Sequence, residues 1–173
     1  DDGSIGAQWH IQEQDKQAQL EALLAVLDRY EWKPAPKINH EGGDIEDLCT
    51  LYTLTDYHVG MYAESEIGGD DWNSEIASNC AINAISQMIT GSPDSHQAIL
   101  NLQGDFFHYD NLEGTTLTSG HVLDRSSGID RMIDAGIHIV NKAIHLLLNK
   151  HKNVHVIICE GNHDLIGSRW LRR

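Results

Sequence analysis

Three short clusters of carboxylate, imidazole and amide side chains are spaced along this 173-residue sequence. The clusters are Asp56-Tyr57-His58, Gly104-Asp105-Phe106-Phe107-His108 and Gly161-Asn162-His163-Asp164. These donor types together suit divalent ions such as Mn²⁺, Zn²⁺ or Fe²⁺. Along an extended chain, alternation puts Asp56 and His58 on the same side, where both can hold one ion. The residue types therefore predict metal chemistry.

Each cluster directly follows an apolar run with the length of a β-strand. The runs are Leu48–Thr55, Ala98–Gln103 and Val154–Cys159. Helical spacing of apolar residues predicts helices between them, over Trp72–Ile89 and Ile129–Lys150. Alternating strands and helices predict an α/β fold with parallel neighbouring strands. Because the carboxyl ends of parallel strands share one edge of a sheet, the three clusters should converge in space.

The order D-x-H, G-D-x-x-[DH], G-N-H-[DE] resembles the calcineurin-like metallophosphoesterases, and the resemblance covers about Leu48–Asp164. It implies a β-sandwich flanked by helices, with two divalent metal ions, Mn²⁺ being the expected one and Zn²⁺ or Fe²⁺ the alternatives. The run G-D-F-F-H is close to the version in nucleases of the double-strand-break repair type. Similar sequences occur in phage-encoded phosphoesterases. The implied activity is phosphate-ester hydrolysis, first of all by a phosphodiesterase or nuclease, with nucleic acid among the candidate substrates.

The resemblance also implies the metal ligands. Asp56 and His58 would hold the first ion. Asp105 would bridge both ions, and Asn162 would hold the second through its side-chain oxygen. Two ions held in this way can clamp a phosphate and activate water for in-line attack.

Two histidines receive catalytic roles from the same resemblance. His163 would face the substrate phosphate, and His108 would assist catalysis as in the nuclease branch, although a supporting or merely exposed position is the alternative for His108. Asp164 would orient His163 or cap its loop.

The family pattern continues beyond Asp164 with a further His and a later G-H-x-H, which this sequence lacks. The resemblance therefore predicts an incomplete site and the N-terminal half of the domain, a β-α-β-α-β unit. A missing C-terminal half, or a second copy of the chain, would complete it. Two alternatives stay open: a non-catalytic binding module, and a phosphomonoesterase of the same family.

Three regions are predicted along the chain: a helical extension at residues 1–36, a loop or linker at 37–47, and the half-domain at 48–173. The extension contains an amphipathic helix, because leucines recur at helical spacing. They are Leu20, Leu23, Leu24 and Leu27.

The net charge is −14, and residues 1–80 hold 17 Asp and Glu against 4 Lys and Arg. Such a surface repels phosphate backbones, so an anionic substrate needs metal ions or added basic residues. Arg169, Arg172 and Arg173 are either part of a phosphate-binding face or the start of an exposed helix. No apolar run has the length of a membrane span, so no membrane partner is expected.

The three cysteines form no C-x-x-C pair, which argues against a structural zinc site and a disulfide framework. Cys49 and Cys159 lie in apolar runs and are predicted to be small buried residues. This usage fits a reducing cytoplasm. Four further histidines are predicted to be structural or surface residues: His138, His145, His151 and His155.

Overall fold

The computed structural model describes residues 44–116 and 119–172, and six residues between 18 and 29. Five of the described residues in the predicted extension are helical and exposed. They are Ala18, Glu21, Leu24, Ala25 and Asp28. Leu24 is 46% exposed, and the other three leucines of the predicted stripe lie outside the described residues. Among the described residues, no helix is both long and apolar enough to cross a membrane.

Three parallel strands form the sheet of the described residues, in the order β1-β2-β3. The strands are β1 (Ile45–Thr55), β2 (Ser95–Gln103) and β3 (Asn153–Cys159). The predicted α/β class is therefore confirmed. The prediction of strand β1 was wrong at its start, because residues 45–47 belong to the strand and not to a linker.

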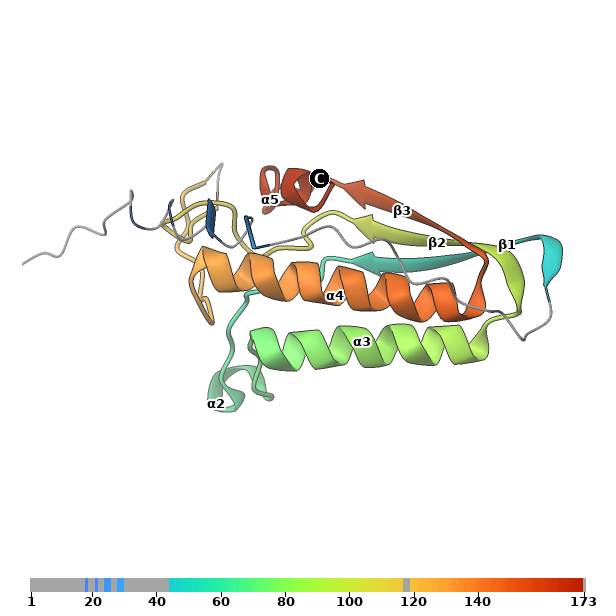
Figure 1. Cartoon of the computed structure of the whole chain (residues 1–173). Helices are drawn as coiled ribbons and strands as arrows, with labels where there is room; N and C mark the ends of the chain where they lie inside the picture. Colours follow the sequence, from blue (N-terminus) through green and yellow to red (C-terminus); the bar gives the residue numbers. More distant parts are fainter. Residues whose placement is uncertain are drawn as a thin grey trace, which may run out of the picture.

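Two long helices, α3 (Ser74–Gly91) and α4 (Ile129–Lys150), pack against each other on the same face of the sheet (Figure 1). Helix α3 begins two residues later than predicted, because the Asn73 side chain accepts hydrogen bonds from the N–H groups of Glu75 and Ile76 and caps it. At its other end, Lys150 donates to the carbonyl oxygens of Ile89 and Ser92. The sequence did not predict the short helix α2 (Ser65–Gly68). The short helix α5 (Gly167–Leu171) contains Arg169, in agreement with the alternative in which the basic end of the chain begins a helix.

The core lies between the sheet and these two helices. Strand side chains that point inward, such as Tyr52, Leu100 and Leu102, are at most 2% exposed. The buried stripe of α4 includes Ile133 and Leu147, as its helical spacing predicts.

The opposite face of the sheet is not covered by any described helix or strand. Leu51 is 58% exposed there, and Ile157 is 45% exposed. The prediction that Cys49 and Cys159 are buried was wrong, because strand alternation places both on this face and both are exposed. The described residues form one sheet, and the two-sheet sandwich stays a prediction.

Candidate functional site

The three predicted clusters meet at the carboxyl ends of the strands, at the left of Figure 1. The turn after β1 lies beside the turn after β2, because the N–H of His58 donates to the Asp105 carbonyl at 2.9 Å. The turn after β3 joins them where the N–H of His163 donates to Asp105 Oδ1 at 2.8 Å. The convergence predicted from the sheet topology is therefore present.

Asp164 fastens the third turn to the second. Its carboxylate is fully buried and accepts hydrogen bonds from the N–H groups of Phe106 and Gly161, both at 2.8 Å, and of Phe107 at 3.2 Å. Of the two roles predicted for Asp164, the structure favours the one that fixes the loop. The ring of His163 is held by another group, since its Nδ1 lies 2.7 Å from the carbonyl oxygen of His108.

The backbone is strained at three of the four predicted metal ligands. Asp56, His58 and Asp105 have φ values of 50°, 51° and 46°, a region that non-glycine residues rarely occupy. In the described part of the chain, no other non-glycine residue has a positive φ. Such strain persists only where the surroundings enforce it, and it clusters at functional sites.

Two groups of side chains bring ligand atoms close enough to share an ion. One consists of Asp56, His58 and Asp105, and the other of His58, His108 and His163. In each group the ligand atoms lie within 4.8 Å of one another. The carboxylate-rich group matches the predicted first metal position, so these residues fit a divalent ion.

Asn162, the fourth predicted metal ligand, is exposed in the same turn. Its two chain neighbours lie against Asp105: the N–H of His163 bonds to the carboxylate, and Asp105 fills the space that a side chain on Gly161 would need. Asn162 is therefore placed beside the predicted bridging carboxylate. Its role as a ligand stays a prediction.

Two of the histidines at the site, His58 and His108, have lowered pKa values. Burial, with smaller contributions from the neighbouring His58 and His163, lowers the pKa of His108 to about 4. Burial and then His163 lower the pKa of His58, while Asp105 and Asp56 oppose the shift. At neutral pH both rings are therefore neutral, the form in which imidazole binds metals.

The metal-free protein should lose stability as the pH falls from 6.5 towards 4. In this window the unfolded chain protonates His108 and the folded chain does not, so protons stabilise the unfolded state. The loss from this residue should reach at most about 3 kcal/mol. The measurement is the free energy of unfolding in urea, with a chelator present, compared between pH about 7 and pH about 5. His108→Asn should reduce the pH dependence, whereas His121→Ala, at an exposed position, should retain it. Equal pH dependence in both variants would contradict the assignment.

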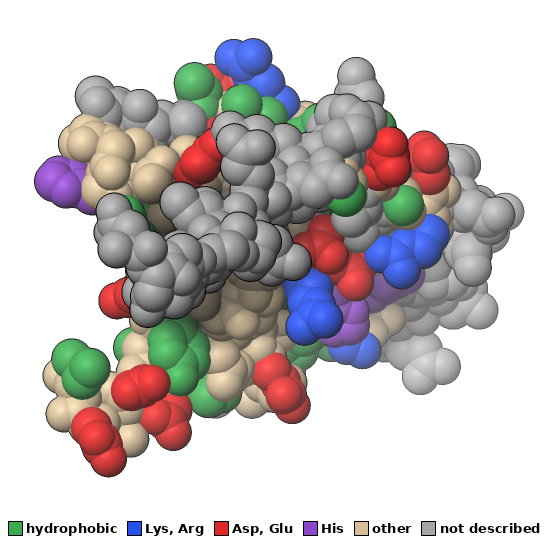
Figure 2. All heavy atoms as spheres, turned by 90° about the vertical axis from the view of Figure 1, so that its left-hand side faces the viewer, with side chains coloured by type: hydrophobic (Ala, Val, Ile, Leu, Met, Phe, Trp, Pro, Cys, Tyr) green, Lys and Arg blue, Asp and Glu red, His purple; other side chains and the backbone are tan. Residues whose placement is uncertain are grey.

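Charged residues surround the site unevenly. Figure 2 faces this end of the molecule and shows acidic side chains spread over it, including a group at the bottom over α2. Arg169 and Arg172 each lie 3.3 Å from Glu160, which directly precedes Gly161. The basic end predicted for the chain therefore lies beside the third turn, with an acidic partner. Arg173 lies outside the described residues.

Two buried polar residues have structural roles, and the sequence analysis missed one of them, Asp110. Asp110 is buried and accepts from the N–H groups of Ile166 and Gly167, which anchors α5. His151, predicted to be structural or at the surface, is fully buried and bonds to Tyr52 and Ser95. No local pattern marks either residue as buried, because their partners are more than 50 positions away in the chain.

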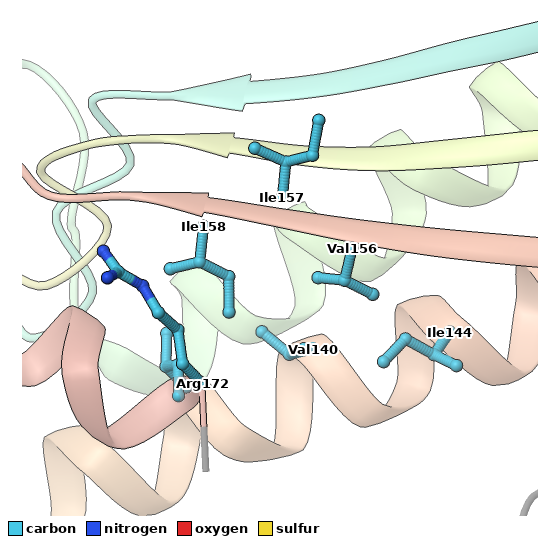
Figure 3. A pocket seen from close by; sticks show the side chains of 7 residues that line it. Val140, Ile144, Val156, Ile157, Ile158 and Arg172 are labelled. Carbon is cyan, nitrogen blue, oxygen red and sulfur yellow. The ribbon is translucent and has the colours of Figure 1, made fainter.

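An apolar groove of about 590 Å³ runs along the outer edge of β3, and its Arg172 end lies near the third turn (Figure 3). Its lining includes Val140 and Ile144 of α4, Val156 and Ile158 of β3, and Arg172. Among the described residues of this lining, Arg172 is the only charged side chain, and it already pairs with Glu160 at 3.3 Å. The groove therefore offers little to bind phosphate.

No family model, curated protein or solved structure matches this chain. The interpretation of the site therefore depends on its own residues and geometry.

Proposed function

We propose that this chain carries the metal-binding part of a metal-dependent phosphoesterase that hydrolyses phosphodiesters at a dinuclear centre. The main support is the convergence of Asp56, His58 and Asp105, three residues in strained backbone conformations whose ligand atoms lie within 4.8 Å of one another. These residues would hold the first ion, and Asp105 with Asn162 the second. Such ions supply charge for phosphate binding and lower the pKa of water.

The chain's own residues suit the remaining tasks. A carbonyl oxygen can only accept, so the 2.7 Å contact with His108 requires a proton on Nδ1 of His163. In the neutral ring this leaves Nε2 as the nitrogen with a lone pair. A half-buried imidazole fixed in this way can bond to a phosphate oxygen, and when protonated it can donate to the leaving group.

Binding of Mn²⁺ to the chain, followed by electron paramagnetic resonance, tests the proposal together with hydrolysis of a nitrophenyl phosphodiester and the matching monoester. We expect Mn²⁺ binding and a preference for the diester. Asp105→Asn should weaken Mn²⁺ binding at least about 10-fold and bring hydrolysis to background. Asp134→Asn, at an exposed position on α4, should behave like the parent chain.

The same experiment separates the alternatives. Hydrolysis of the monoester alone would indicate a phosphomonoesterase. Mn²⁺ binding without hydrolysis would favour a half-domain completed by another unit, for which the exposed apolar side chains on the uncovered sheet face are the supporting observation. A chain that neither binds Mn²⁺ nor hydrolyses either ester would contradict the proposed function.

A further inference from the structure

Three imidazole rings meet where the turns converge, and only one of them belongs to the carboxylate-rich group. The centroid of the His58 ring lies 4.8 Å from that of His163 and 5.2 Å from that of His108. The rings of His108 and His163 are stacked at 5.8 Å. His108 is 8% exposed, and the other two rings are half-buried. Bulk water therefore has little access to His108 and partial access to His58 and His163.

Hydrogen bonds orient the rings, and one of these bonds goes to a backbone carbonyl. The bond from Nδ1 of His163 to His108 leaves Nε2 of His163 as the lone-pair nitrogen. Nδ1 of His108 lies 3.2 Å from Nδ1 of His58, within hydrogen-bond distance, so one of these two nitrogens carries a proton and the other a lone pair. This arrangement, in which the second ring nitrogen donates to a carbonyl, is typical of metal-binding histidines.

The spacing of the nitrogens also fits a small ion. Nδ1 of His58 and Nδ1 of His108 are 3.2 Å apart. Two nitrogens at about 2.0–2.1 Å from one tetrahedral zinc ion are about 3.3 Å apart. The ligand atoms of all three histidines lie within 4.8 Å of one another, so small side-chain movements would bring the third nitrogen to the same centre.

We propose that His58, His108 and His163 form a nitrogen-only site for one transition-metal ion such as Zn²⁺, as an alternative to the position of Asp56, His58 and Asp105. Imidazole suits Zn²⁺, whereas carboxylate-rich sites suit Mn²⁺. Both positions need His58, so only one of them is filled at a time. Zn²⁺ at the three histidines therefore removes a ligand from the proposed dinuclear centre and occupies both rings assigned to catalysis. We therefore expect Zn²⁺ to inhibit phosphodiester hydrolysis. This expectation rests on the proposed function, whereas the histidine metal site itself does not.

Titration of the 173-residue chain with Co²⁺, a coloured substitute for Zn²⁺, tests the site. We expect the strong visible absorption of tetrahedral Co²⁺ at one ion per chain, and its disappearance when Zn²⁺ is added. His163→Ala should weaken Co²⁺ binding more than about 100-fold, because it removes a direct ligand. His108→Asn is a second variant with the same expected result, and His121→Ala, at an exposed position, is the matched control. Circular dichroism of each variant verifies that it is folded.

Two further measurements separate this proposal from the proposed function. Asp105→Asn keeps an oxygen that can accept from the N–H of His163, so the Co²⁺ spectrum should be unchanged while Mn²⁺ binding is lost. His163→Ala should leave Mn²⁺ binding unchanged while the Co²⁺ spectrum is lost. If folded His163→Ala and His108→Asn variants retain the spectrum, or if Asp105→Asn removes it, the histidine site is wrong. A chain without any tetrahedral Co²⁺ spectrum also overturns it, whatever the result with Mn²⁺.

Discussion

Replacing Gly161 with alanine should remove most Mn²⁺ binding without changing any predicted ligand. An added Cβ at this position would lie 2.1 Å from Oδ1 and 2.2 Å from the backbone N of Asp105. Neither atom can stay in place, because real Cβ contacts are never so short. We expect Asp105 to be displaced and Mn²⁺ affinity to fall at least about 10-fold. The free energy of unfolding should fall by about 1–3 kcal/mol, as for other overpacked sites.

Gly91 offers the matched control. It lies at the end of α3, and a Cβ there would meet no atom within 4 Å. Gly91→Ala should leave Mn²⁺ binding unchanged and should alter stability by less than about 1 kcal/mol. If Gly161→Ala binds Mn²⁺ as well as Gly91→Ala does, then Asp105 does not contribute to metal binding from the position described here.

Asp164→Ala should produce the largest loss of stability among the substitutions at the site. The buried carboxylate accepts three backbone hydrogen bonds, from residues on two different turns. Its removal leaves two buried N–H groups and one partly buried N–H group without an acceptor, and each buried one costs about 1–3 kcal/mol. The costs overlap, so we expect a total of about 3–5 kcal/mol in urea unfolding of the metal-free chain.

Asp134→Ala is the control for this experiment, because Asp134 is exposed on α4. Its effect should stay within about 0.5 kcal/mol. Asp164→Ala should also weaken Mn²⁺ binding, since the third turn holds His163 against Asp105. If the free energy of unfolding of Asp164→Ala stays within about 1 kcal/mol of that of the parent chain, Asp164 does not fasten the turns.

The sequence by itself determined which residues could bind metal and on which edge they would lie. The predicted strands and helices alternate, and parallel strands bring their carboxyl ends together, so Asp56, His58 and Asp105 converge as expected. The element bounds were predicted within a few residues, because the hydrophobic periodicity of each element is local. The error at the start of β1 arose because the acidic residues Glu46 and Asp47 separate Ile45 from the apolar run that begins at Leu48.

Only the tertiary structure decided how the converging turns are held and which faces are covered. The role of Asp164 depends on N–H groups of Phe106 and Phe107, nearly 60 positions away, and no sequence pattern encodes such a pairing. The exposure of Cys49 could not be predicted either, because an apolar run does not show which face of its strand another layer will cover. The grouping of His58 with His108 and His163 likewise appears only in space, since the three residues come from three separate turns.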